Sequence, residues 1–322
     1  MRTRRWRVLV ATEPLPLAAL RRGKGATREA RRAGDGGREA RRAGDGGHGT
    51  ALLALLAAAG CSGEALPSPS SIRALRVVAL VTDTPEVAPG ASARVAAAWV
   101  DPVSGRPFRA RWQLCAERDV ADPRACPTAD RAVDLGEGPA VTTPALTAAG
   151  TYFVLVAACA GATPSLSRAL GHWRCDDGSA AEEVFRRVVV TETVPRNRPP
   201  AIATWGFARG DASVMVPSGE DASVTLPGCD GGACGAWTVR VVPAAGSAEA
   251  LPDGGREALS ASFYVTSGTT ASPRDTANPG EERELAVRWT PGASSSSSVW
   301  VVLRDQRGGE SARGAAVTGS GR

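Results

Sequence analysis

Few residues of this 322-residue chain could carry out covalent chemistry. It contains seven cysteines, one lysine (Lys24) and two histidines (His48 and His172). A catalytic serine or cysteine needs a base beside it, usually a histidine. His172 lies in the segment GHWRC, and no Gly-x-Ser-x-Gly elbow occurs in the chain, so we interpret it as a loop residue. Because Lys24 is near the N-terminus, lysine Schiff bases and P-loop phosphate binding are excluded from the rest of the chain.

Two acidic pairs, Asp176-Asp177 and Glu182-Glu183, could form a carboxylate site or bind Ca²⁺ weakly. Adjacent acids in a loop are more typical of a solvated face. The sequence has no HExxH helix, EF-hand loop or glycine-rich phosphate loop. We therefore expect no catalytic residue, no metal and no cofactor. The alternative hypothesis is a secreted hydrolase, or its accessory subunit, in which two converging carboxylates do the chemistry.

Cys61 differs from the other cysteines because it directly follows an uncharged apolar run, TALLALLAAAG at 50–60. Eleven residues are too few to span a bilayer, which takes about 20. The run has the length of the apolar core of a secretory signal, about 7–15 residues behind a positively charged segment. Residues 1–60 are thus predicted to be a basic extension followed by an export signal. The alternative is a buried apolar helix with an incidental cysteine.

The segment Ala58-Ala59-Gly60-Cys61 resembles the lipobox of bacterial lipoproteins, although leucine is commonest in that family where Ala58 stands. The resemblance implies that the Cys61 sulfur carries a diacylglyceryl group and that the signal is cut before it. It also implies a bilayer as partner through this anchor. Ser62 follows the cysteine where some sorting signals have aspartate, so the resemblance favours the outer membrane over the inner one.

The basic charge of the chain is concentrated before this signal. Residues 1–49 hold 13 basic and 5 acidic residues, whereas residues 50–322 hold 25 basic and 28 acidic ones, out of 38 and 33 in all. The body is therefore slightly acidic, which argues against nucleic-acid binding. The ten residues REARRAGDGG occur twice, at 28–37 and 38–47. We interpret this repeat as an over-long positive segment or an upstream start, and the alternative is a basic arm.

Beyond the cysteine, the sequence predicts a tether and an all-β body of two tandem immunoglobulin-like sandwiches. The tether is residues 61–71, rich in Pro, Ser and Gly. Short Val/Ala-rich runs separated by Pro, Gly, Asp and Ser then recur, as in antiparallel sandwiches. We place the first sandwich at 72–194 and a proline-rich linker at 195–200. The second sandwich follows at 201–318, with a frayed tail at 319–322.

In the first sandwich, alternation places Phe108, Ala110, Trp112 and Leu114 of one strand on one face, with Arg109, Arg111 and Gln113 on the other. Strands are expected near 75–81, 93–100, 108–114, 151–158 and 183–191, and a short helix is expected at 179–182. The segment PEVAPGASARVAAAWVDPVSGRPFRARWQL resembles bacterial immunoglobulin-like domains, which implies that Trp112 is the core tryptophan. In the same way AAGTYFV implies a tyrosine corner at Tyr152, and Val154 stands where antibody domains have their inter-sheet cysteine.

The second sandwich has expected strands near 202–207, 213–216, 223–226, 237–242, 261–266, 284–289 and 299–304. The segment SSVWVVLRDQRGG resembles the last hairpin of immunoglobulin-like or PKD-like modules. It implies a turn at 305–309 and a closing strand at 311–318. Residues 294–298, a run of five serines, are expected to form a loop.

This layout resembles the predicted envelope lipoproteins of GC-rich myxobacteria, which have a lipobox, a tether and immunoglobulin-like modules. The resemblance implies no activity. We therefore expect an exported, lipid-anchored, non-catalytic protein whose loops contact another envelope protein, a glycan or peptidoglycan.

The other six cysteines are expected to pair in sequence order, as Cys115–Cys126, Cys159–Cys175 and Cys229–Cys234. If the strands that end at Cys115 and Cys159 are antiparallel neighbours, these two cysteines lie at opposite ends and too far apart to be bridged. Each then pairs with the cysteine in its following loop. The last pair encloses Asp-Gly-Gly-Ala, where the glycines permit a tight turn. A metal-thiolate site is the alternative for Cys229 and Cys234, but an exported chain meets an oxidising compartment, which favours disulfides.

Overall fold

The described strands form two β-sandwiches, one from the residues before the linker and one from those after it. The computed structural model describes residues 69–103, 105–120, 122–167, 171–219, 222–227, 235–294 and 296–319. Cys61, Cys229 and Cys234 lie outside these residues. The protein is therefore all-β as expected, and among the residues just given the two helical segments are short 3₁₀ helices, η1 (Glu117–Asp119) and η2 (Pro123–Thr128).

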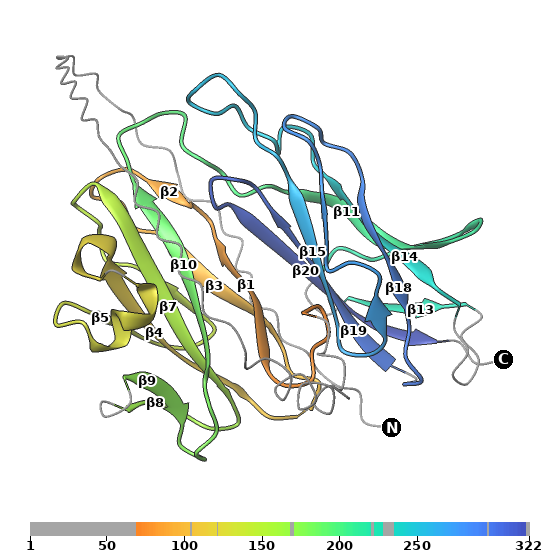
Figure 1. The fold of residues 1–322 in the computed structure, drawn as a ribbon, viewed down its shortest axis with the longest axis horizontal. Helices are drawn as coiled ribbons and strands as arrows, with labels where there is room; N and C mark the ends of the chain where they lie inside the picture. Colours follow the sequence, from red (N-terminus) through yellow and green to blue (C-terminus); the bar gives the residue numbers. More distant parts are fainter. Residues whose placement is uncertain are drawn as a thin grey trace, which may run out of the picture. The chain divides into compact units, whose positions relative to one another are not determined.

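The first sandwich pairs a three-stranded sheet, β1-β3-β6, with a five-stranded sheet, β2-β10-β7-β4-β5. A separate hairpin, β8-β9, lies between β7 and β10 in the chain (Figure 1). The strands are β1 (Arg76–Thr82), β2 (Glu86–Val87), β3 (Arg94–Val100), β4 (Phe108–Ala116), β5 (Val133–Glu137), β6 (Ala140–Thr142), β7 (Gly150–Ala160), β8 (Pro164–Ser167), β9 (His172–Cys175) and β10 (Glu182–Val190).

The core of this sandwich contains the residues that the sequence predicted. Trp112 is fully buried, and its indole N–H donates to the Gly138 carbonyl at 2.7 Å. The Tyr152 hydroxyl donates to the Ala148 carbonyl at 3.2 Å, which is the bond of a tyrosine corner. Val154 is fully buried without a cysteine partner, so apolar packing does here what the inter-sheet disulfide does in antibody domains.

The second sandwich pairs two five-stranded sheets, β12-β11-β14-β18-β16 and β13-β20-β19-β15-β17. Its core is centred on Trp237, Trp289, Phe207 and Phe263, all buried. The strands are β11 (Ile202–Arg209), β12 (Ala212–Met215), β13 (Ser223–Leu226), β14 (Trp237–Pro243), β15 (Ser260–Val265), β16 (Thr269–Thr270), β17 (Arg274–Thr276), β18 (Leu285–Thr290), β19 (Ser296–Arg304) and β20 (Glu310–Gly319).

Two expectations about local structure were wrong. Residues 179–182 form no helix, because Asp177 accepts the Ser179 N–H at 2.9 Å in a turn and β10 starts at Glu182. The serine run is not entirely a loop, since Ser296–Ser298 extend β19 by pairing with β20. The sequence also missed the short strands β2, β5, β6, β8, β9, β16 and β17, where pairing rather than side-chain pattern defines the strand.

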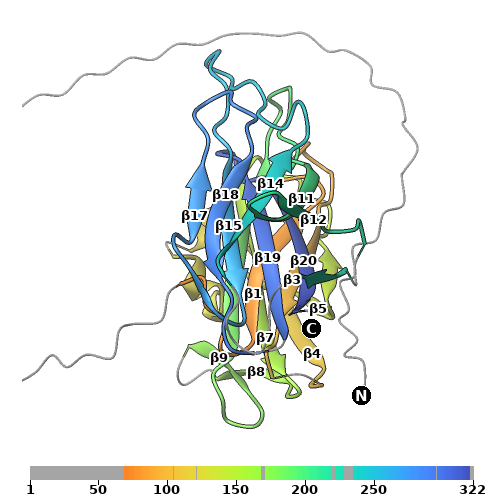
Figure 2. The same cartoon turned by 90° about the vertical axis from the view of Figure 1, so that its right-hand side faces the viewer.

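The two sandwiches pack against each other through the outer faces of β1, β19 and β20. This junction contains a cluster of buried apolar residues separate from both cores: Ile72, Val78, Ala79, Ala98, Val100, Trp300, Val302 and Ala312. The sheets therefore stack in four layers, with the two middle sheets in contact. Figure 1 shows β1 beside β20, and in Figure 2 the strands of both sandwiches run lengthwise in a common direction, as in aligned sheet packing.

The segment just before β1 is hydrogen-bonded to the second sandwich. Val265 of β15 donates to the Ser70 carbonyl at 2.8 Å, and Ile72 donates to the Val265 carbonyl at 2.8 Å. The hydroxyls of Ser70 and Thr270 are 2.5 Å apart. All the described residues fall in one compact unit, so the two sandwiches are not separate domains joined only by a linker.

The packing of Trp300 on Gly314 offers a test of the junction. These residues are cross-strand partners, and a Cβ built on Gly314 would lie 2.6 Å from the Trp300 ring. We expect Gly314→Ala to lower the free energy of unfolding by about 1–3 kcal/mol, because the ring would be displaced from a tightly packed cluster. Chemical denaturation measures this change.

A double-mutant cycle provides the control. In a Trp300→Ala background the same glycine substitution has no ring to displace and should cost much less. Equal costs in both backgrounds would show that Trp300 does not pack here as described.

Candidate functional site

The structure forms two of the three disulfides expected from the sequence. Cys115 and Cys126 are joined with a Cα–Cα distance of 5.8 Å, and Cys159 and Cys175 with one of 5.9 Å. Strands β4 and β7 are antiparallel, with Cys115 opposite Phe153 near one end and Cys159 opposite Arg109 near the other. The separation that the sequence argument assumed is therefore present. The Cys229–Cys234 pair stays a prediction, for which non-reducing peptide mapping is the measurement.

Both disulfides lie on the outer face of the five-stranded sheet of the first sandwich. Cys115 shares the face of Arg109 and Arg111, yet it is only 2 % exposed. Its cover comes from the loop with η1 and η2 and from the β8-β9 hairpin. These segments form a second apolar cluster, whose buried members are Cys115, Val120, Cys126, Phe153, Leu155, Ala157 and Trp173. The disulfides thus fasten two loops onto a sheet face that would otherwise be exposed.

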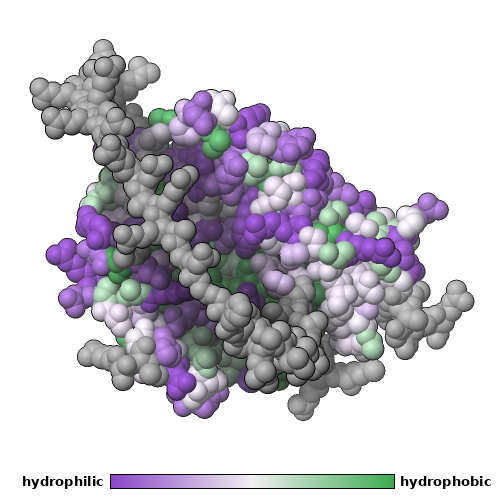
Figure 3. Space-filling model, viewed as in Figure 1, coloured by the Kyte–Doolittle hydropathy of each residue, from purple (hydrophilic) through white to green (hydrophobic). Residues whose placement is uncertain are grey.

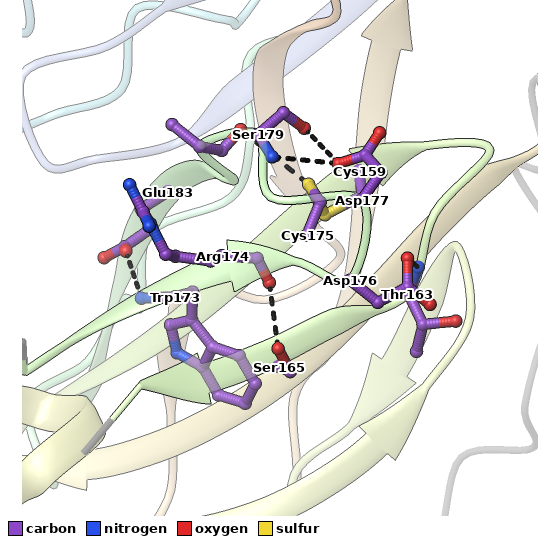
Figure 4. The surroundings of a disulfide bond; sticks show 11 residues. Cys159, Thr163, Ser165, Trp173, Arg174, Cys175, Asp176, Asp177, Ser179 and Glu183 are labelled. Carbon is purple, nitrogen blue, oxygen red and sulfur yellow. Dashed lines mark hydrogen bonds between the residues drawn. A yellow bond between two sulfur atoms is a disulfide. The ribbon is translucent and has the colours of Figure 1, made fainter. Parts of the chain in front are cut away.

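The polar residues that surround Cys159–Cys175 hold a turn (Figure 4). Asp177 accepts from the N–H and the hydroxyl of Ser179 at 2.9 and 2.7 Å. Asp176 accepts the Thr163 N–H at 3.1 Å. These bonds satisfy backbone donors in the loop, which explains why aspartates are placed there.

The second acidic pair divides between two partners. Glu183 accepts the Trp173 N–H at 2.8 Å (Figure 4), whereas Glu182 lies 3.4 Å from the Arg76 guanidinium. His172 is exposed at the start of β9, outside this turn. The candidate carboxylates from the sequence therefore do not converge. Among residues 69–319, as far as they are described, no group of three or more His, Cys, Asp or Glu side chains could hold a metal ion.

A cluster that sequence reasoning missed lies at the junction of the sandwiches. Glu310, the first residue of β20, is 4 % exposed. Its carboxylate accepts the Arg304 Nε–H at 2.9 Å and lies 3.2 Å from the Arg186 Nη1. Arg186 comes from β10 of the first sandwich and is also buried, so this ion pair crosses the junction. Burial lowers the pKa of Arg186, because desolvation disfavours the charged form.

The same side chains complete the open edge of β1. This strand pairs with β3 on one side, and a bulge lies at Val78 between the paired residues Val77 and Ala79. On its other side the Leu80 N–H donates to Glu310 at 2.8 Å, and Arg304 donates to the Val78 carbonyl at 3.3 Å. A carboxylate and a guanidinium from the second sandwich therefore replace a neighbouring strand and cover an edge that would otherwise be free to pair with another chain.

A second part of the cluster surrounds Arg307 in the β19-β20 turn. Its guanidinium forms a bidentate pair with Glu86 of β2, in which Nε donates to Oε1 at 3.0 Å and Nη2 to Oε2. Glu249 and Glu257 each lie 4.0 Å from it. Arginine suits this position because its planar fork can engage a carboxylate with two donors while meeting others at its edges.

The linker is part of this arrangement and not a free connector. The Asn197 N–H donates to Glu86 at 2.9 Å, and its side-chain amide donates to Asp305 at 3.2 Å. The Arg307 guanidinium also donates to the Pro195 carbonyl at 3.3 Å. Asn197 is 2 % exposed. Groups from both sandwiches and from the linker thus meet at one place.

Burial changes the ionisation of two carboxyls in this part. Desolvation raises the pKa of Glu257 to about 7, helped by the nearby Asp305 charge. Desolvation also raises the pKa of Asp305. Raised carboxyl pKa values are typical of catalytic acids as well. Glu257, however, is fully buried among protein groups, so we interpret the cluster as a fastening between sandwiches.

The described residues show neither a large exposed apolar patch on the face in view nor a membrane-spanning helix that would indicate a ligand or a bilayer contact. On the face seen in Figure 3, hydrophobic side chains occur in small patches among hydrophilic ones. The large apolar side chains that are exposed are scattered over the fold: Val103, Val133, Phe185, Val194 and Met215. Within the described part of the chain, no helix has the length and apolar character to cross a membrane.

Comparison with known proteins gives likenesses of fold only. No protein-family model and no curated protein matches the chain. The adhesin InvE of Yersinia pseudotuberculosis is 13 % identical over 76 % of this chain and 60 % of its own, with a TM-score of 0.22. The D00-D0 domain of Intimin is 14 % identical over 77 % of this chain and 98 % of its own, with a TM-score of 0.21. The alpha-2-macroglobulin of E. coli is 10 % identical over 75 % of this chain and 16 % of its own, with a TM-score of 0.22. Likenesses this low establish neither a family nor a function.

Removal of Glu310 tests the fastening. We expect Glu310→Ala to lower the free energy of unfolding by about 3–5 kcal/mol, because the buried Arg186, the half-buried Arg304 and the Leu80 N–H would lose their acceptor. Urea denaturation monitored by tryptophan fluorescence measures the change. The matched control is Glu117→Ala, since Glu117 is exposed and lies 3.8 Å from Arg187; its cost should be about 0–1 kcal/mol. If both variants lowered the free energy of unfolding by similarly small amounts, Glu310 would not stabilise the junction as described.

Proposed function

We propose that this chain is an exported, non-catalytic protein of the bacterial envelope, anchored by lipid on Cys61, whose double sandwich serves as a binding or structural module. The observation that carries the proposal is the pair of disulfides, Cys115–Cys126 and Cys159–Cys175. Disulfides of this kind form and persist in oxidising compartments and are rare in the cytosol. They agree with the export signal that the sequence predicts at 50–60.

The disulfides have a structural use that fits such a compartment. Each closes a loop onto the outer face of the five-stranded sheet, and the cysteine sulfurs are buried. Loops of 11 and 16 residues gain stability on closure, typically 2–4 kcal/mol in the chain-entropy model. A protein kept in a reducing cytosol would not have this contribution, and the cover over Phe153 and Trp173 would be weaker.

The place where the tether meets the body supports an anchoring role. Ser70 and Ile72 are hydrogen-bonded to β15, nine residues after Cys61. A chain of that length spans at most about 30 Å. A lipid on Cys61 would therefore hold this end of the body close to a membrane and leave the other ends of the sheets free for a partner. Another envelope protein, a glycan or peptidoglycan is the partner class that we propose, with the outer membrane as the site.

The test is the fate of the anchor. We expect mass spectrometry of the mature protein to find Cys61 as the N-terminal residue, carrying lipid. Cys61→Ser should leave the protein in the soluble envelope fraction or uncleaved, because serine offers no sulfur for the diacylglyceryl group. Ser62→Ala is the matched control and should remain in the membrane fraction. Unmodified residues 1–60 on the mature wild-type protein would contradict the proposal.

A further inference from the structure

The part of the junction around Arg307 holds more carboxyls than one guanidinium can neutralise. Glu86, Glu249 and Glu257 all lie within 4.0 Å of Arg307. Asp305, two residues before it, adds a fourth carboxyl. Three of the four accept a hydrogen bond from another group: Asp305 from the Gly309 N–H at 2.6 Å, Glu86 from the Asn197 N–H at 2.9 Å and Glu249 from the Arg198 N–H at 3.3 Å. Glu86 also takes two donors of the guanidinium. Glu257 has one backbone donor, the Glu249 N–H at 3.1 Å, and it is the one that is fully buried.

Glu257 is also the most deeply buried of these groups. None of its surface is exposed. Its Oε2 accepts the Glu249 N–H at 3.1 Å, whereas its Oε1 has no hydrogen-bond partner. An ionised carboxylate in such a position has a desolvation cost that too few hydrogen-bond donors offset. A neutral carboxyl avoids most of that cost.

The carboxyl lies at the base of a hairpin on the second sandwich. The Glu257 N–H donates to the Glu249 carbonyl at 2.9 Å, and the Leu251 N–H donates to the Gly255 carbonyl at 2.8 Å. The base is tied in turn to its surroundings, because the Arg198 N–H of the linker donates to Glu249 at 3.3 Å and the Gly280 N–H donates to the Glu257 carbonyl at 2.9 Å. Residues 249–257 are called the latch hairpin below.

We propose that the neutral carboxyl of Glu257 holds the base of the latch hairpin closed against the linker and the β19-β20 turn, and that its ionisation releases the hairpin. The charged groups that face it are Asp305 and Arg307 from the β19-β20 turn, Glu249 from the hairpin itself, and Glu86 from β2 across Arg307. Glu282 accepts the Gly246 and Ala248 N–H groups beside the hairpin and lies 4.0 Å from Arg256. The balance of this set is acidic, so it favours the protonated form of Glu257. The proposal does not depend on the lipid anchor.

The direction of the pH effect follows from the raised pKa of Glu257. In the closed hairpin this pKa is about 7, against an ordinary value of 4.5 once the carboxyl is in water. The closed state therefore keeps its full advantage below pH 4.5 and loses it as the pH rises through about 7. From about pH 5.5 to about pH 8.5, linkage predicts an increase of about thirtyfold in the opening constant of the hairpin.

Hydrogen exchange of the full chain tests the latch. After correction for intrinsic exchange, protection of the amides of Leu251, Gly254 and Glu257 should fall about thirtyfold over that pH range. In Glu257→Gln, which keeps an acceptor for the Glu249 N–H but cannot ionise, protection should change by less than about twofold. Glu192→Gln removes an exposed carboxylate and the same unit of charge, and it should behave as wild type.

Two results would overturn the proposal. One is a pH dependence in Glu257→Gln equal to that of the wild type, and the other is protection in the wild type that does not fall. If Glu257→Gln fails to fold, a carbon-13 NMR titration of the Glu257 carboxyl in the wild-type protein decides the question. A midpoint near 7 supports the latch, and a midpoint near 4.5 excludes it.

Discussion

Strand β1 belongs to one sandwich but is buried on both faces, and the rest of the structure depends on this. One face packs on the core around Trp112, and the other packs on Trp300 and Val302 of the second sandwich. Its free edge is bonded by Glu310 and Arg304. A strand so placed cannot separate from the second sandwich without exposing apolar surface and unpaired backbone groups. Both costs oppose independent motion of the two halves.

This constraint also accounts for the charge in the junction. A cluster of Arg186, Arg304, Arg307 and five carboxyls would be expensive in a purely apolar interface. Here the charged groups form hydrogen bonds with backbone groups at the edge of β1 and along the linker. The apolar cluster provides the burial, and the polar groups fix how the sheets sit on each other. The apolar residues on the outer face of the first sandwich are buried in a different way, by loops that two disulfides hold in place.

The sequence predicted the parts that depend on local pattern. Alternation placed Trp112 on the core face and Arg109 and Arg111 on the opposite one, and the resemblance of AAGTYFV to immunoglobulin-like domains implied the tyrosine corner at Tyr152. The junction could not be located, because nothing in a single sequence says which outer faces meet. A signal for it was nonetheless present: VVALV within β1 and VWVVL within β19 are continuous apolar runs. A strand with one solvated face alternates, whereas a continuous run is typical of a strand buried on both faces.

The polar cluster was beyond sequence reasoning for a related physical reason. In the sequence its members look like ordinary surface charges: Glu86, Glu257, Glu310 and Arg307. Only the packing of distant segments removes them from water. The short strands β2 and β6 were missed similarly, since their pairing partners define them. Local pattern determines which residues can form a sheet, and long-range packing determines which of its faces remains exposed to solvent.

Differential scanning calorimetry of the full chain tests most directly whether the two sandwiches form one unit. We expect a single transition in which the calorimetric and van't Hoff enthalpies agree, because neither half can unfold without uncovering β1. Two resolved transitions, or a calorimetric enthalpy about twice the van't Hoff value, would show that the sandwiches unfold independently and would contradict the central role given to this strand.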